Sequence, residues 1–193
     1  MANDNVTDLR DTIAPKSDQL NADELLSGPV TVFITSVTRG NNEQPVVIHF
    51  KGDDGRPYKP CKTMRKLLVA AWGEDGRKWE GRWLKLFQDG EVIFGGVKVG
   101  GIRISHASDI PTSISPMLTS GRGKKTCFHL IKLDVPQEIL EGRDALLAAH
   151  LAGTDALNKA IEALTPRQAK ALGDAYIGRL KLLAETNSKK EGA

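Results

Sequence analysis

Cationic and aromatic side chains alternate along residues 59–106, and the run 72–87 (WGEDGRKWEGRWLKLF) is the richest part of that stretch. The run holds three tryptophans and four cations among turn-forming glycines. These residue types together are typical of surfaces that bind single-stranded nucleic acid, because cations contact the backbone phosphates and aromatic rings stack on the bases. Each stacked base contributes about 1–3 kcal/mol. The stretch therefore predicts a binding face for a polyanion.

The net charge of the chain is only +3, but its distribution along the sequence is uneven. Residues 51–85 hold ten cations against five acids, and residues 98–132 hold six cations against one acid. Residues 1–28 hold two cations against six acids, and residues 134–193 hold eight against nine. Positive charge concentrated in the middle of a chain is the footprint expected of a polyanion-binding protein. The C-terminal stretch is not expected to contact nucleic acid.

Hydrophobic alternation predicts the strands that would carry this face. Strands are expected at 30–37, 45–50, 56–61, 82–87, 91–94, 97–99 and 102–105, with a hairpin at 117–120 and 126–133. A helix is expected at 62–71, where Met64, Leu67, Leu68 and Ala71 recur at helical spacing. Three strands, a helix and further strands follow the order of an oligonucleotide-binding (OB) barrel. The predicted fold is therefore α+β, an OB-fold-like five-stranded β-barrel with extra hairpins and a C-terminal helical segment.

The chain is predicted to divide into four segments. Residues 1–27 form an acidic flexible arm, which either stays solvated or covers the basic face until nucleic acid displaces it. Residues 28–134 form the OB-like barrel domain, residues 135–187 the helical segment, and residues 188–193 a disordered tail. Helices are expected at 137–151, at 155–164 after a cap at Thr154, and from 166 to about 186. Their large aliphatic side chains must bury against the barrel, against each other or against a second copy of the chain. These side chains are Leu146, Leu147, Leu151, Leu157, Ile161, Leu164, Leu172, Ile177, Leu180 and Leu183.

The candidate contact residues are the cations of the predicted barrel and the aromatics among them. They are Arg56, Tyr58, Lys59, Lys62, Arg65, Arg77, Lys78, Trp79, Arg82, Trp83, Arg103, Arg122, Lys124 and Lys125. Trp79 is expected to be accessible because it lies in a charged loop, with Tyr58 as the second choice. Trp72 closes the predicted helix and is expected to be buried, whereas the position of Trp83 is left open. Leu84 and Leu86, on the opposite face of the strand from Trp83, are the clearer core residues.

No group of residues suggests catalysis, a cofactor or a metal. Cys61 and Cys127 form no C-x2-C pair, and Ser105-His106 lacks a third catalytic partner. We therefore predict that the protein is not an enzyme and holds no cofactor. No apolar run approaches the roughly 18 residues of a membrane span, and the acidic N-terminus is unlike a signal peptide. A location in the cytoplasm, without membrane contact, is expected.

Five segments of the sequence resemble a family of phage and prophage proteins of proteobacteria. They are 15–23 (PKSDQLNAD), 58–64 (YKPCKTM), 72–75 (WGED), 79–82 (WEGR) and 95–106 (GGVKVGGIRISH). The Lys-Thr, Trp-Gly and Trp-x-Gly pattern is similar to that of phage single-stranded-DNA-binding proteins of recombination modules. The resemblance covers residues 15–133 and implies single-stranded DNA binding in phage recombination or replication, in the cytoplasm of the host cell. The acidic C-terminal tail usual in bacterial single-strand binders has no counterpart in the ending SKKEGA.

Two functions follow as hypotheses. The first is non-catalytic coating of single-stranded DNA by the basic barrel. The C-terminal helices would then assemble a homo-oligomer or dock a phage recombinase or a host protein. The second is a phage-encoded protein-interaction factor, such as an inhibitor of a host defence or replication protein, in which the barrel is only a scaffold.

Overall fold

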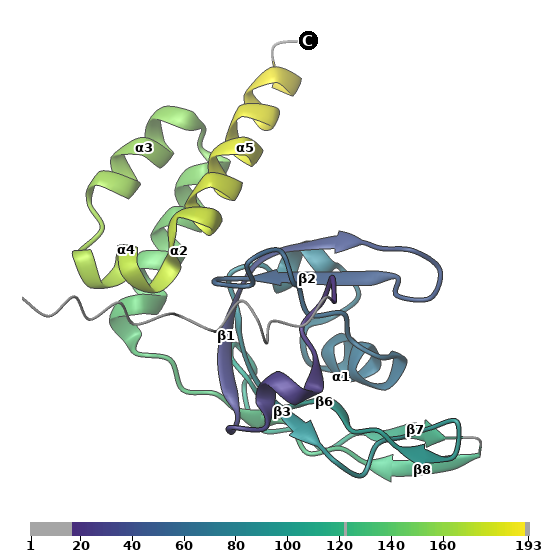
Figure 1. The fold of residues 1–193 in the computed structure, drawn as a ribbon. Helices are drawn as coiled ribbons and strands as arrows, with labels where there is room; N and C mark the ends of the chain where they lie inside the picture. Colours follow the sequence, from purple (N-terminus) through teal and green to yellow (C-terminus); the bar gives the residue numbers. More distant parts are fainter. Residues whose placement is uncertain (1–16, 122, 192–193) are drawn as a thin grey trace, which may run out of the picture.

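The computed structural model describes residues 17–121 and 123–191, which fold into a sheet unit and a helical unit (Figure 1). The sheet unit comprises residues 17–133 and the helical unit residues 137–191. The α+β class predicted from the sequence is confirmed. None of the described helices is long and apolar enough to span a membrane.

The sheet unit is built on a five-stranded mixed sheet with the order β2-β1-β3-β6-β9. Its strands are β1 (Val30–Arg39), β2 (Val46–Phe50), β3 (Trp83–Asp89), β6 (Gly101–Ala107) and β9 (Ile131–Lys132). Neighbouring strands are antiparallel apart from β6 and β9, which are parallel. The sheet is not closed into a barrel, which corrects that part of the prediction.

The segment predicted as a third strand, residues 56–61, is not a strand of the sheet. It contributes one bridge, in which Tyr58 and Ile48 of β2 exchange two backbone hydrogen bonds of 2.9 Å. Pro57 and Pro60 stand close on either side of Tyr58, and proline has no backbone N–H to donate to a neighbouring strand. The segment therefore leaves the sheet after one pair and enters helix α1 (Lys62–Trp72).

Helix α1 packs on one face of the sheet, as its apolar spacing predicts. Met64, Leu67 and Leu68 are fully buried, so the helix predicted at 62–71 and its core face are confirmed. They pack with sheet residues that include Ile34, Ile48, Leu84 and Leu86. We call this cluster the first core.

Two hairpins extend from the sheet unit. Strand β4 (Ile93–Phe94) pairs with β5 (Val97–Lys98), and β7 (Met117–Gly121) pairs with β8 (Lys124–Cys127). The strand predicted at 126–133 is broken, since β8 ends at Cys127 and β9 begins only at Ile131. Between them Leu130 is fully buried and bridges to Ile114, and this anchor directs β9 alongside β6.

The described part of the predicted arm is packed rather than extended. A short 3-10 helix, η2 (Ala22–Leu25), places Leu25 in the first core, where it is 3% exposed. The backbone N–H of Leu20 donates to the Pro57 carbonyl at 3.0 Å. The arm prediction is thus wrong for residues 20–25, and residues 1–16 lie outside the described part of the chain.

The helical unit contains α2 (Gln137–Leu151), α3 (Thr154–Glu162), α4 (Pro166–Leu172) and α5 (Asp174–Glu191). The bounds of α2 are those predicted, and Gly153 rather than Thr154 is the N-cap of α3. The predicted third helix is divided, because Gly173 has φ +77°, a left-handed conformation that ends α4. Helix α5 continues to Glu191, so the predicted tail is helical as far as the structure describes it.

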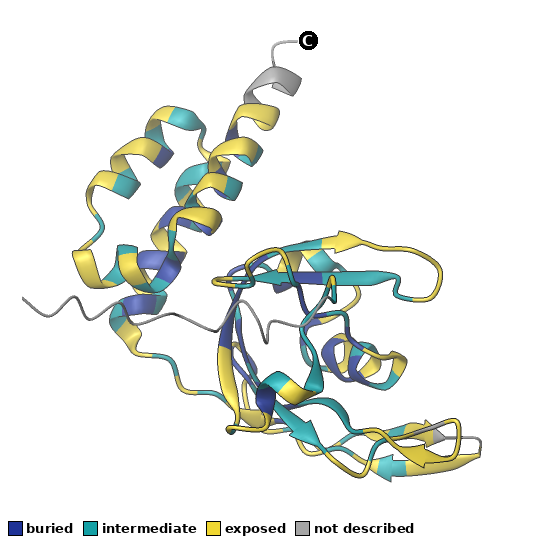
Figure 2. Ribbon diagram, in the orientation of Figure 1, coloured by how far each residue is buried: buried dark blue, intermediate teal, exposed yellow. Residues whose placement is uncertain are grey.

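A second core joins the two units. Phe33 and Trp83 project from the other face of the sheet, and Leu146, Leu157 and Tyr176 of the helices pack with them. Buried residues accordingly line the helices where they face one another and the sheet (Figure 2). Of the ten aliphatic side chains predicted to need burial, nine lie in this cluster, and Leu151 is 71% exposed. The helices therefore bury against the sheet and each other, without requiring a second copy.

Candidate nucleic-acid interface

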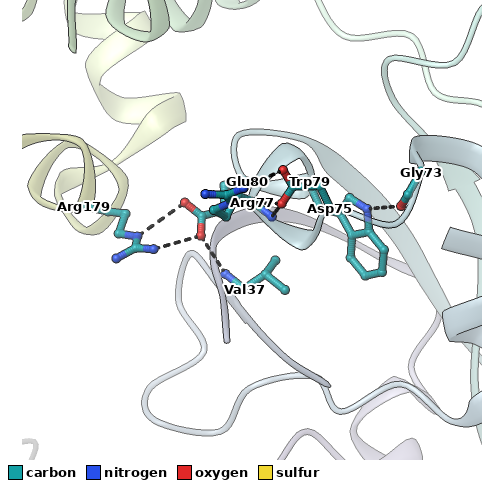
Figure 3. A network of polar contacts seen from close by, with 7 residues as sticks. All are labelled: Val37, Gly73, Asp75, Arg77, Trp79, Glu80 and Arg179. Carbon is teal, nitrogen blue, oxygen red and sulfur yellow. Dashed lines mark hydrogen bonds and ion pairs between the residues drawn. The ribbon is translucent and has the colours of Figure 1, made fainter. Parts of the chain in front are cut away.

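The loop that holds Trp79 packs into the fold and is not an exposed binding loop (Figure 3). Its 3-10 turn, η3 (Gly76–Trp79), turns the indole inward, where Trp79 is 3% exposed and belongs to the first core. The indole Nε1–H donates to the Gly73 carbonyl at 3.0 Å, and the Asp75 carboxylate accepts from the backbone N–H of Arg77 at 3.1 Å. The prediction that Trp79 is accessible for stacking is therefore wrong.

Glu80, the next residue, ties this loop to both units. Its carboxylate accepts the backbone N–H of Val37 in β1 at 3.1 Å and pairs with the Arg179 guanidinium of α5 at 3.2 Å (Figure 3). The Glu80 side chain is 7% exposed, so its carboxylate is largely withdrawn from water, whereas Arg179 is 29% exposed. Sequence reasoning missed both residues, because a charged residue in a polar loop carries no signal of its distant partner.

The other candidate stacking residues are also buried. Tyr58 is 2% exposed, and Trp83 packs against Phe33 with ring centroids 4.5 Å apart. Trp72 is buried as predicted, and its Nε1–H donates to the Ser108 carbonyl at 2.8 Å. Among the described side chains, only Phe50, Phe87 and Phe128 are partly exposed aromatics. Stacking by Tyr58, Trp79 or Trp83 is thus excluded by their burial.

Burial of Tyr58 has a consequence at alkaline pH. Loss of solvation raises the pKa of the Tyr58 hydroxyl above its ordinary value of 10, because the phenolate is costly in the core. The folded protein then holds a proton that the unfolded chain releases, so this contribution to stability is complete below pH 10 and is lost as pH rises above it. Burial raises the pKa of Tyr176 in the same direction.

We expect the free energy of unfolding, measured in urea, to fall as pH rises above the ordinary tyrosine pKa of about 10. A Tyr58→Phe variant should lose part of this dependence, since phenylalanine has no proton to release. A free energy of unfolding that stays constant across this range in the unmodified chain would contradict the assignment.

Four of the predicted contact cations are already paired with acids. Arg56 pairs with Glu24 at 2.8 Å and Lys59 with Asp18 at 2.7 Å, so the N-terminal segment supplies two of the acids. The other two pairs are Arg77 with Asp75 at 3.0 Å and Arg103 with Asp89 at 3.4 Å. The hydrogen bond from Lys59 lowers the pKa of the Asp18 carboxyl. Ion pairs at a surface contribute little to stability, so a phosphate can replace such an acid at little cost.

Three of the predicted cations without an ion pair, Lys62, Lys124 and Lys125, lie on α1 and on the β7–β8 hairpin, which pack together. The Thr63 hydroxyl of α1 donates to the Thr119 carbonyl of β7 at 3.1 Å, and Thr119 is the cross-strand partner of Lys125. We call the exposed lysines at this junction the lysine patch. It consists of Lys62, Lys66, Lys124 and Lys125, none of which forms an ion pair with another described residue. Lys66, one helical turn after Lys62, is not among the predicted contact residues.

The remaining candidates lie elsewhere. Arg65 is partly buried, and its Nε has no hydrogen-bond partner among the described residues. Lys78 is exposed on η3, and Arg82 is partly buried beside Trp72 at the opposite end of α1 from Lys62. Arg122 lies outside the described residues. The predicted contact residues are therefore divided into the lysine patch, the cations that form ion pairs and the cations near η3.

A cavity of about 530 Å³ does not have the geometry of a nucleophilic site. It is lined by Ser36, His49 and Asp53, and His49 Nδ1 lies 2.8 Å from the Asp53 carboxylate. Ser36 faces His49 across the strands but makes no hydrogen bond to it, so the serine is not activated by this imidazole. Within the described residues, no group of three or more histidine, cysteine or acidic side chains could hold a metal ion.

Comparison of the chain with protein-family models, with curated proteins and with solved structures found no significant match. The resemblance to phage single-strand binders therefore stays a prediction from the sequence.

Proposed function

We propose that this chain binds single-stranded DNA without catalysing a reaction, and that the lysine patch is its main contact surface. The observation that carries the proposal is the packing of α1, which holds the exposed Lys62 and Lys66, against the β7–β8 hairpin, which holds the exposed Lys124 and Lys125. Cations without acidic partners attract a polyanion more strongly than paired ones, because no internal bond has to be exchanged.

The arrangement of the sheet unit supports a nucleic-acid-binding fold of the OB type. Strand β1 lies between β2 and β3, Tyr58 bridges to β2, and α1 connects the Tyr58 segment to β3. With β9 added beside β6, this arrangement resembles the strand order of an OB barrel whose closing strand pair is absent. We therefore propose an open OB-like sheet, in which the prolines beside Tyr58 limit the pairing of that segment to one bridge.

Burial of the tryptophans changes the expected mode of binding. With Tyr58, Trp79 and Trp83 in the cores, contacts to phosphates must supply most of the affinity. Binding should therefore depend strongly on salt and show little preference among bases, because phosphate contacts carry no sequence information.

We expect a labelled oligothymidylate to bind with an affinity that falls as salt rises, with a slope of about −0.7 for each lysine in contact. Replacing Lys62 and Lys66 by glutamine, or Lys124 and Lys125, should each reduce the magnitude of that slope by about 1.4. Fluorescence anisotropy over a series of salt concentrations measures the slope. The matched control replaces Lys159 and Lys181, two exposed lysines of the helical unit, by glutamine. A flat slope in the unmodified chain, or an equal loss in the control, would refute the lysine patch as the interface.

A second candidate function, binding of a host or phage protein, is favoured by the β4–β5 hairpin. Ile93, Val97 and Val99 on this short segment are 54–63% exposed, which is unusual for three neighbouring aliphatic side chains. This candidate becomes the better one if neither double variant of the lysine patch changes binding to DNA.

A further inference from the structure

A cavity of about 310 Å³ lies between the η3–β3 segment and helix α2, away from the lysine patch. Four cations line it, which are Arg77, Lys78, Arg82 and Arg143. The two acids in its lining are Glu80 and Asp109. The cavity walls therefore carry an excess of two positive charges.

Both acids of the cavity are already engaged. Glu80 pairs with Arg179 and accepts the backbone N–H of Val37, and Asp109 pairs with Arg143 at 2.8 Å. Arg77 is paired with Asp75, which does not line the cavity. Lys78 and Arg82 are thus the two cations of the lining that have no ion pair within the described residues.

Arg82 is the least satisfied of these groups. Its guanidinium is partly buried and lies 5.2 Å from the Trp72 ring, and no side-chain hydrogen bond from it to another described residue is present. Burial lowers the pKa of Arg82, Asp109 opposes this effect and the like charge of Arg143 adds to it. A half-buried guanidinium with no acidic partner favours an anion beside it, because the anion would replace the part of its hydration that burial removes.

Arg143 forms a rigid wall of the same cavity. Its side chain is 8% exposed and lies 5.6 Å from the Trp83 ring, and its guanidinium donates to the Gly81 carbonyl at 3.2 Å. Contacts of 2.8 Å with Asp109 and Asp144 fix its orientation. A guanidinium held in place loses little conformational freedom when a ligand enters.

We propose that this cavity binds a phosphate group, with Arg82 and Lys78 as its ligands beside the fixed guanidinium of Arg143. A phosphate monoester carries about −1.5 to −2 charges at neutral pH, which matches the two unpaired cations. The oxygens of a phosphate also fit the planar fork of a guanidinium, which donates two parallel hydrogen bonds. The site is separate from the lysine patch and does not depend on the function proposed for that patch.

The test is a titration of the full chain with inorganic phosphate, with sodium chloride adjusted to hold the ionic strength constant. Tryptophan fluorescence should change in a saturable manner, because the guanidinium groups of Arg82 and Arg143 lie over Trp72 and Trp83. Calorimetry gives a second readout that does not depend on the tryptophans. Absence of saturable binding by both methods would overturn the proposal.

Two variants locate the site. Arg82→Gln and Lys78→Gln should each weaken phosphate binding by about tenfold or more, the effect expected for a lost hydrogen bond to a charged group. Arg167→Gln is the matched control, since Arg167 is 68% exposed on α4 and its partner Glu138 is outside the cavity. Lys78 is exposed, so its variant tests the site even if Arg82→Gln disturbs the packing of Trp72. Equal affinities in all three variants would overturn the proposal.

A last pair of ligands identifies the source of the phosphate. If the site receives the end of a nucleic acid, a short oligothymidylate with a 5′-phosphate should bind more tightly than the same oligonucleotide without the phosphate. Arg82→Gln should remove this difference in affinity. Equal binding of the two oligonucleotides, with inorganic phosphate still bound, would assign the cavity to a small phosphorylated compound. The double variants of the lysine patch should retain phosphate binding in either case, so failure of one site is distinguishable from failure of the other.

Discussion

Replacing Trp79 by alanine is expected to lower the free energy of unfolding by about 3–5 kcal/mol, the cost typical of emptying an aromatic core site. The indole is 3% exposed in the first core, and its Nε1–H donates to the Gly73 carbonyl. The variant removes the ring and leaves that carbonyl without its partner. Urea denaturation followed by circular dichroism measures the change.

The control for this experiment is the neighbouring residue. Lys78 is exposed on the same turn, and Lys78→Ala should change the free energy of unfolding by no more than about 0.5 kcal/mol. Trp79→Phe should give an intermediate loss, since part of the ring volume remains but the hydrogen bond does not. If Trp79→Ala were as stable as Lys78→Ala, the indole would lie outside the core and could contact a ligand.

The second large effect is expected at Gly81, where the loop meets the helical unit. Gly81 has φ +79°, and a Cβ built there would lie 2.4 Å from the Tyr176 hydroxyl oxygen. Tyr176 is fully buried in the second core, so its ring has no room to withdraw. Backbone strain costs about 1–3 kcal/mol and overpacking a further 1–3 kcal/mol. Gly81→Ala should therefore destabilise the chain by about 2–6 kcal/mol in urea denaturation.

Gly90→Ala is the matched control, because Gly90 has no positive φ and no atom lies within 4 Å of an added Cβ. Tyr176→Phe provides a rescue, since the Tyr176 hydroxyl is buried with no hydrogen-bond partner among the described residues. In the double variant, removing this oxygen should recover much of the loss that comes from overpacking, although the ring carbon Cζ stays 3.0 Å from the added Cβ, and it should leave the part that comes from φ. Equal stability of Gly81→Ala and Gly90→Ala would show that the helical unit does not press on this loop.

The predictions at Trp79 and Gly81 bear on function because residues 72–87 contain two kinds of residue. Some stabilise the fold, and others are available to contact a ligand. Trp79, Glu80 and Gly81 hold the sheet unit, α1 and α5 together. Arg77, Lys78 and Arg82 project from the same segment into the cavity beside α2. Residues 72–87 therefore connect the sheet unit to the helical unit, and their cations line the cavity between η3–β3 and α2.

Local features of the sequence determined much of the framework. Alternation predicted β1 and β2, and the helical spacing of Met64, Leu67 and Leu68 predicted α1 and its buried face. The bounds of α2 followed from Pro136 and the change to a helical period. These predictions held because each depends on residues a few positions apart, where backbone geometry alone sets which side chains share a face.

The burial of Phe33 and Trp83 on the second face of the sheet could not be predicted from local spacing. Alternation placed Trp83 opposite Leu84 and Leu86, but it could not show that the helical unit covers that face as well. Trp79 was assigned to the surface from its charged neighbours, whereas the η3 turn points the indole inward and its neighbours outward.

The binding surface itself was decided by contacts between distant segments. The sequence determined that the middle of the chain is rich in cations, but not which of them are free. Tertiary structure paired Arg56 and Lys59 with acids of the N-terminal segment, and it packed α1, which holds Lys62, on the hairpin that holds Lys125. Charge along a chain is a property of composition, whereas the field at a surface depends on which opposite charges folding places within a few ångströms.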